Sequence, residues 1–206
     1  MEGIYRGILA SAAPGEYDEN ALPSYTHSNR LMAWLFWKRI DVALRLLGDI
    51  SGKSVLDFGC GGAVTFKYLD RMHNRIVGCD ENIALAKQVC DALDINAGLC
   101  QDLFKISETK FDFILALDVL EHIEDSSALL GKFRSLLHAN GKIILSGPTE
   151  NFWYKVGRKL AGFSGHYHLK NIYQIEQEFT AHGFISERVH TLYHPVPLFR
   201  VSRWAA

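Results

Sequence analysis

A glycine-rich turn that follows a short apolar segment is the first feature of this sequence that could bind a ligand. The run Ser54–Phe58 predicts a buried strand, and glycines follow it at Gly59, Gly61 and Gly62. Glycine has no Cβ, so the backbone of such a turn can approach a ligand closely. Residues 62–71 are expected to form a helix directly after it. The order of strand, turn and helix indicates a cofactor site, although an ordinary tight turn gives the same pattern.

Aspartates recur at or beside the ends of four apolar segments. Parallel strands bring their carboxyl ends to one edge of a sheet, so these side chains are predicted to lie near one another. Asp80 follows the glycines by about 20 residues, the usual position of an acid that binds two ribose hydroxyls. Four acids on one edge favour a neutral or cationic, hydroxyl-rich ligand over a bare phosphate. The four residues are Asp57, Asp80, Asp102 and Asp118.

Five motifs occur in order along the chain: VLDFGCGG at 55–62, VGCD at 77–80, QDL at 101–103, FDFILALDVLEHI at 111–123 and LLHANGKIILS at 136–146. Together they resemble the class I S-adenosylmethionine-dependent methyltransferases. The resemblance is strongest to the small-molecule branch that includes the ubiquinone-pathway O-methyltransferases. It is tight over residues 50–148 and continues loosely to Phe184.

The resemblance implies an α/β fold. This is a Rossmann-like, doubly wound, mainly parallel seven-stranded sheet with helices on both faces and an antiparallel last strand. It also implies a single methyltransferase domain over residues 1–206, with four parts: an N-terminal lid segment at 1–30, a cofactor-binding core at 50–148, an acceptor-side lid at 149–168, and a C-terminal helix and strands at 169–206. The implied activity is methyl transfer from S-adenosyl-L-methionine to a small, apolar or lipid-like acceptor, with O-methylation favoured.

The resemblance assigns cofactor contacts residue by residue. Asp57 would hold the ammonium group of the cofactor directly or through water, and Gly59 and Gly61 would pass close to its methionine part. Asp80 would accept from the 2′- and 3′-hydroxyls of the ribose, as an ionised carboxylate can. The whole implied set is Asp57, Gly59, Cys60, Gly61, Asp80, Glu81, Asn82, Asp102, Leu103, Leu117 and Asp118.

The later motifs would complete the cofactor site. Asp102 would accept from the adenine amino group while the Leu103 N–H faces the ring, and Leu117 and Asp118 would line the wall near the sulfonium. Both aspartates could instead cap the helices that follow their strands. The two roles are compatible.

Two segments outside the cofactor half bear on the acceptor. Residues 31–39 are apolar nearly all round and then basic, which predicts a helix buried on the sheet or one that rests partly on a membrane or an apolar substrate. Residues 152–163 are aromatic and basic where the family has a lid, although a plain surface helix is the alternative. We expect these acceptor-side residues to fold over the pocket: Tyr17, Tyr25, Phe152, Trp153, Tyr154, His166 and His168.

Histidines are the candidate bases. The imidazole titrates near neutral pH, so His122 or His168 could take a proton from a hydroxyl acceptor. Either ring could instead only hydrogen-bond the backbone. His166 and His168 are two residues apart, but a zinc site needs more ligands at hand. No metal site is therefore expected.

Bulk properties limit the partners. The 206 residues include 22 basic and 23 acidic ones, and this balance implies no polyanion such as nucleic acid as a partner. The small-molecule acceptor is what the resemblance implies. The four cysteines lack metal-binding spacing and are expected to be reduced core residues of a cytoplasmic protein. No leader and no membrane-spanning stretch is expected. Peripheral membrane contact and the oligomeric state stay open.

Two other functions fit parts of the pattern. A chain of the same fold could bind the cofactor without catalysis, as a partner subunit of another protein. A nicotinamide dinucleotide site would need a small residue where Val64 stands, and its pyrophosphate would lie beside Asp57. Both facts disfavour the dinucleotide.

The remaining pattern predicts strands that alternate with helices. Such alternation gives right-handed crossovers and a parallel sheet. Helices are expected at 30–47, 82–92, 125–138 and 169–182, and strands at 54–58, 75–79, 97–101, 111–117, 141–146 and 198–204.

Overall fold

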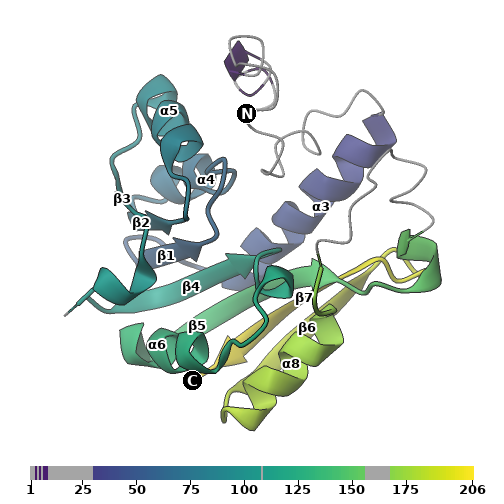
Figure 1. Ribbon diagram of the computed structural model, residues 1–206. Coiled ribbons are helices and arrows are strands. Elements are labelled where there is room, and N and C mark those ends of the chain that lie inside the picture. The colour runs from purple at the N-terminus through teal and green to yellow at the C-terminus, as the bar shows by residue number, and fades with distance from the viewer. Residues whose placement is uncertain (1–2, 4, 6, 9–29, 108, 156–167) are drawn as a thin grey trace.

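The structure, a computed structural model, describes residues 3, 5, 7–8, 30–107, 109–155 and 168–206. Figure 1 shows one central sheet with helices packed around it. The strands are β1 (Ser54–Phe58), β2 (Arg75–Cys79), β3 (Ala97–Cys100), β4 (Phe111–Leu117), β5 (Leu137–Pro148), β6 (Ile185–Leu192) and β7 (Phe199–Ala205). The helices are α3 (Arg30–Leu47), α4 (Phe66–Arg71), α5 (Ala84–Leu93), α6 (Ser127–Leu136) and α8 (Ile172–Ala181), with 3-10 turns η1 (Leu103–Lys105) and η2 (Leu120–His122).

The seven strands form a single sheet in the order β3-β2-β1-β4-β5-β7-β6. All pairs from β3 to β5 are parallel. The last strand, β7, runs antiparallel to both of its neighbours, β5 and β6. The predicted fold class, a mainly parallel seven-stranded sheet with an antiparallel last strand, is confirmed.

Each face of the sheet buries its own core. Neighbouring residues of one strand point to opposite faces, so Val55 packs in one cluster and Leu56 in the other. Buried residues of α3, α4 and α5 cover the Val55 face, whereas those of α6 and α8 cover the Leu56 face. The two covered faces explain why β1 and β4 are apolar almost throughout.

The helix expected at 62–71 begins later, at Phe66. Gly61 and Ala63 have φ angles of 45° and 53°, which lie in the left-handed region and cannot belong to an α-helix. The Ala63 N–H donates to the carbonyl of Cys60 at 2.7 Å, which closes a tight turn instead. The prediction that a helix begins directly after the glycine-rich turn is therefore wrong.

Element ends elsewhere differ by a few residues. The helix predicted at 125–138 ends at Leu136, because Leu137 has extended angles and pairs with Phe111 at the start of β5. The predicted C-terminal strand at 198–204 is β7, in spite of the two nearby prolines.

Gly59 provides a test of the turn. Its φ is 75°, and a Cβ there would lie 2.5 Å from Cγ2 of Val119 in the loop after β4. We expect Gly59→Ala to lower the free energy of unfolding by about 2–4 kcal/mol, through backbone strain and overpacking. Thermal or urea unfolding measures this loss.

Gly131→Ala in α6 is the matched control, since nothing lies within 4 Å of its Cβ position. This change should be neutral or slightly stabilising. Equal stability of the Gly59→Ala and Gly131→Ala proteins would contradict the assigned clash.

Candidate functional site

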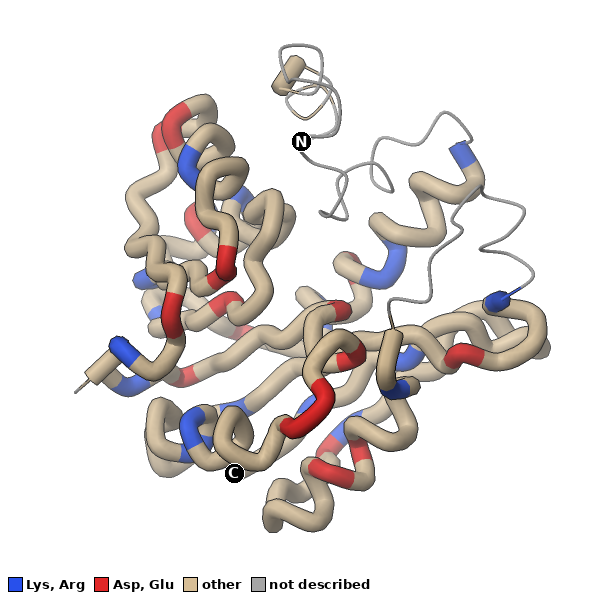
Figure 2. Tube along the Cα trace, viewed as in Figure 1, with Lys and Arg blue, Asp and Glu red and all other residues tan. Residues whose placement is uncertain are grey.

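Four aspartates lie at the carboxyl ends of β1 to β4, as the parallel register requires. Asp57 in β1 pairs with Gly78 on one side and Leu115 on the other. Asp80 directly follows β2, and Asp118 directly follows β4. Asp102 lies two residues after the end of β3. In Figure 2 lysines and arginines are spread over several elements of the trace.

Asp57 is the most buried of the four acids, with 3% of its surface exposed. It accepts a hydrogen bond from Oγ1 of Thr65 at 2.6 Å. Burial raises the pKa of Asp57 to about 7, against the opposing effect of the Thr65 hydroxyl, and the nearby charge of Asp80 adds to the rise. A carboxylate under this desolvation cost is well matched to a cationic group of a ligand.

Asp80 ties the end of β2 to the glycine-rich turn. Oδ2 accepts from the N–H of Gly61 at 2.8 Å, and Oδ1 accepts from the N–H of Asn82 at 3.0 Å. A carboxylate has about four acceptor sites, so both oxygens can still accept from ligand hydroxyls. This geometry fits the ribose role that the sequence suggested.

Three other residues of the predicted cofactor set differ in their exposure to solvent. Glu81 and Asn82 are exposed, and the Asn82 side chain accepts from the N–H of Ala84 at the start of α5. Cys60 is buried, and its burial raises the pKa of the thiol. Cys60 therefore stays protonated and contributes packing rather than a nucleophile.

The glycine-rich turn is held from the other side by an N-terminal residue. The hydroxyl of Tyr5 donates to the carbonyl of Gly62 at 2.7 Å, and the Tyr5 ring is fully buried and stacks on Trp37. Gly59 is enclosed by Val119, so its missing Cβ makes room for protein rather than directly for a ligand. No sequence motif indicated a role for Tyr5.

Asp102 caps η1. Its side chain accepts from the N–H of Phe104 at 2.9 Å, the capping role named as an alternative. Leu103 is buried beneath this turn. Asp102 itself is only partly buried, so a ligand at the edge could still reach it.

Asp118 lies in a charged contact that the sequence did not predict. It forms an ion pair with Arg39 of α3, and the Arg39 side chain is 2% exposed. Oγ of Ser146 in β5 donates to Asp118 at 3.0 Å. Burial raises the pKa of Asp118, while the charge of Arg39 acts in the opposite direction. Leu117, just before it, is partly buried.

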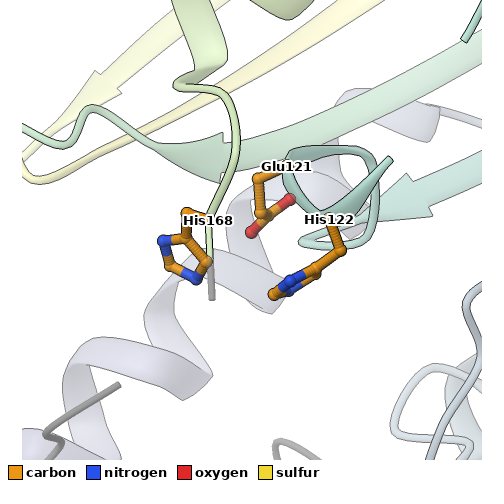
Figure 3. A group of neighbouring side chains, drawn as sticks. All are labelled: Glu121, His122 and His168. Atoms are coloured by element: carbon orange, nitrogen blue, oxygen red, sulfur yellow. The ribbon is translucent and has the colours of Figure 1, made fainter. Parts of the chain in front are cut away.

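Glu121, His122 and His168 come together beside this ion pair. Each offers one potential ligand atom, and these atoms lie within 4.8 Å of one another. Figure 3 shows Glu121 and His122 on the turn after β4 and His168 on the segment that leads into α8. The two imidazole rings are 5.1 Å apart and T-shaped. One carboxyl and two imidazoles are groups that can hold a metal ion.

Glu121 is the least exposed member, at 1%. Burial raises its pKa well above the usual range, and the charge of Asp118 adds to this. Its Oε2 has no hydrogen-bond partner among the residues that the structure describes. The sequence placed Glu121 in a motif without giving it a role, although its position beside His122 was the available signal.

The segment after residue 167 is anchored at Glu121. The N–H groups of Leu169 and Lys170 both donate to the Glu121 carbonyl, at 2.8 and 3.3 Å. Nδ1 of His168 lies 2.5 Å from Oε1 of Glu150. Both predicted histidines therefore lie together, although 45 residues separate them in the chain. No feature of the sequence indicated that Glu150 contacts His168.

Part of the expected acceptor side lies within the described residues. Residues 152–155 are helical, and within them Trp153 is 57% exposed while Tyr154 is buried against Phe199. The Tyr154 ring also approaches His168, with centroids 6.2 Å apart. The other predicted acceptor-side residues, Tyr17, Tyr25 and His166, lie outside the described residues.

The chain belongs to the methyltransferase domain family, whose model matches residues 30–187. A curated relative, the ubiquinone biosynthesis O-methyltransferase of Azorhizobium caulinodans, is 34% identical over 109 residues, which cover 50% of this chain and 43% of the relative. The corresponding protein of Alkalilimnicola ehrlichii is 27% identical over 120 residues, which cover 55% and 49%. The matches thus span about half the length of these curated relatives.

Solved structures share the fold over nearly the whole chain. Magnesium protoporphyrin IX methyltransferase from Synechocystis PCC 6803, with bound S-adenosylhomocysteine, has a TM-score of 0.70 at 19% identity and covers 97% of this chain and 99% of that one. The N-methyltransferase NodS from Bradyrhizobium japonicum WM9, also in complex with S-adenosylhomocysteine, has a TM-score of 0.66 at 14% identity, covering 98% and 97%. The fold is that of class I methyltransferases.

None of the helices in the described ranges is long and apolar enough to cross a membrane.

The raised pKa of Asp57 predicts a pH-dependent stability. Asp57 binds its proton more tightly in the folded state than in the unfolded state. The free energy of unfolding therefore falls as pH rises from about 4 to 7. Asp57→Asn removes the charge and keeps an acceptor for Thr65. We expect the variant to melt several degrees higher than the ligand-free wild type at pH 8, with the difference shrinking toward pH 5.

Asp70→Asn on α4 is the control, because Asp70 is exposed. Thermal unfolding at both pH values checks the expectation. A variant Asp57→Asn that melts lower at pH 8 would contradict the assigned burial cost.

Proposed function

We propose that the chain transfers a methyl group from S-adenosyl-L-methionine to a small, apolar or lipid-like acceptor, with a hydroxyl oxygen as the favoured target. The observation that carries the proposal is the arrangement of Asp57 and Asp80 around the glycine-rich turn. One is a buried acid suited to an ammonium group, and the other is a paired acceptor suited to two hydroxyls. Family membership supports the same activity.

The cofactor-side residues fit the cofactor's chemistry. Asp57 would hold the ammonium, Asp80 the ribose hydroxyls, and Asp102 with the Leu103 N–H the adenine. When bound, the cofactor supplies a methyl group on a sulfonium that is already activated for displacement. The protein then has to align the acceptor and exclude water, which are effects of proximity and enclosure.

A histidine would take the acceptor's proton. His122 is exposed and His168 partly buried, and both lie beside the carboxyl end of β4. The imidazole of histidine is a suitable general base for a hydroxyl. The convergence of two histidines from distant segments supports this role.

Exposed apolar side chains support contact with a membrane or an apolar acceptor. Leu31 and Trp34 on the first turns of α3 are 61% and 52% exposed, and Phe152 and Trp153 are 70% and 57% exposed. Trp34 packs on Tyr193, and Phe152 packs on Trp153, so two pairs of aromatic rings include exposed members. Single exposed rings are ordinary, but paired exposed rings favour contact with an apolar surface.

Two experiments test the proposal. Calorimetry should show binding of S-adenosylhomocysteine, and a labelled-methyl transfer screen over quinone precursors, lipids and small natural products should yield a methylated acceptor. Sedimentation with anionic vesicles tests membrane contact separately. Cofactor binding without transfer to any acceptor would favour the non-catalytic subunit.

The ribose role predicts the effect of Asp80→Ala. Losing charged acceptors of two hydroxyls should weaken S-adenosylhomocysteine binding by about 1.5–3 kcal/mol, or roughly ten- to a hundredfold in Kd. Titration calorimetry on the folded variant measures this. Asp91→Ala on the exposed side of α5 is the control and should bind as the wild type does; unchanged affinity in Asp80→Ala would remove the assignment.

The acceptor side predicts a different result for Trp153→Ala. Turnover or acceptor affinity should fall about tenfold while cofactor affinity stays within a few fold, because an exposed ring there serves the acceptor rather than the core. Steady-state kinetics and calorimetry separate the two effects. Ile185→Ala on β6, where the side chain is 66% exposed, should change neither. Loss of cofactor binding in Trp153→Ala would refute the acceptor role.

A further inference from the structure

We propose that Glu150 is a positioning residue that orients His168 and fixes which of its ring nitrogens carries the proton. Nδ1 of His168 lies 2.5 Å from Oε1 of Glu150. The inference rests on the proposed function, in which His168 takes a proton from the acceptor hydroxyl. No sequence motif pointed to Glu150.

The contact determines the tautomer of the ring. An ionised carboxylate only accepts hydrogen bonds, so Nδ1 must be the nitrogen that donates. Neutral His168 then carries its lone pair on Nε2, since a neutral imidazole has one donor and one acceptor nitrogen. In this tautomer Nε2 can accept a proton from the acceptor hydroxyl. In the other tautomer Nε2 already carries a hydrogen and cannot act as a base.

The Glu150 side of the contact is fixed by its neighbours in the chain. The side chains of Thr149 and Asn151 both donate to the carbonyl of Pro197, between β6 and β7. Between these anchors, Glu150 has a φ of 50°, in the left-handed region that costs a non-glycine residue free energy. Such strain persists only where the surroundings impose it, and here it aims a carboxylate at one imidazole.

The His168 side is fixed independently. The next two residues, Leu169 and Lys170, donate their N–H groups to the carbonyl of Glu121. The His168 and Glu150 side chains are only 14% and 17% exposed, so water competes weakly for their contact. The two ends of the β5–α8 connection, each anchored separately, therefore meet at one hydrogen bond, the arrangement of a support for a functional ring.

The proposed proton transfer breaks one O–H bond and forms one N–H bond. The acceptor O–H bond breaks, its proton moves to Nε2 of His168, and the oxygen keeps the electron pair. Glu150 keeps its hydrogen bond to Nδ1 while the ring is protonated, and the proton later passes from Nε2 to solvent. Glu150 touches neither acceptor nor cofactor in this scheme; it acts only through His168.

The first test observes the tautomer without any activity assay. In protein labelled with ¹⁵N-histidine, two-bond proton–nitrogen correlation spectra distinguish Nδ1–H from Nε2–H rings, and the signal missing in His168→Gln identifies His168. We expect the Nδ1–H form in the wild type and in Glu150→Gln, whose amide oxygen still accepts. Glu150→Ala should lose this preference. A wild-type His168 with its proton on Nε2 would overturn the proposal, even if the alanine variant failed to fold.

The second test uses kinetics with the acceptor found by the screen. Glu150→Ala should lower kcat about tenfold to a hundredfold, while acceptor KM and cofactor Kd stay within about threefold. Glu150→Gln should recover most of the lost turnover. Glu124→Ala, at an exposed position in the loop after η2, is the control and should match the wild type.

The outcomes separate this inference from the proposed function. Unchanged kcat in Glu150→Ala, or an equal loss of cofactor binding, overturns the positioning role while methyl transfer stands. A wild-type protein that methylates no acceptor contradicts the proposed function, and the tautomer spectra alone then decide whether Glu150 orients His168.

Discussion

The parallel register of β1 with β2 and β4 is the constraint on which the rest of the site depends. It aligns Asp57 with Gly78 and Leu115, and so brings the residues that follow β2 and β4 to the same edge. The glycine-rich turn can then receive a carboxylate from the next strand, because Asp80 reaches the Gly61 N–H only in this register. A slip of one residue would turn each of these side chains toward the opposite face. The two buried cores hold the register, since each strand residue has a helix-covered face to fill.

This edge gathers acids at an electrostatic cost. Asp57, Asp118 and Glu121 are all withdrawn from water, and burial raises the pKa of each. Within the described residues, Arg39 is the buried cation in contact with one of them, and Thr65 and Ser146 contribute hydroxyl donors. Buried charge without full compensation lowers stability, and such sites concentrate where a protein binds or reacts. The proposed cofactor, which carries a positive charge and hydrogen-bond donors, would relieve part of this cost.

The sequence alone predicts the strands and helices whose bounds depend on local patterns of apolar residues. Three of the strands, β1, β2 and β4, and the helix α3 have the expected bounds, because apolar runs and their spacing define them. The start of α4 was wrong by four residues, since the left-handed φ of Ala63 follows from the packed turn and not from alanine's preference. Arg39, Glu150 and Tyr5 carried no signal of their partners. Each meets a residue far away in the chain, and a single sequence gives no measure of such proximity.

Two backbone carbonyls organise the proposed acceptor side. The carbonyl of Glu121 receives the chain just after His168, and the carbonyl of Pro197 receives the side chains on both sides of Glu150. The first connects the loop after β4 to the start of α8, and the second connects the end of β5 to the β6–β7 loop. His168 and Glu150 thus lie near opposite ends of the β5–α8 connection, and each end is anchored to a different part of the fold. Their contact can therefore serve the orientation of one ring, because the fold is already held by other bonds.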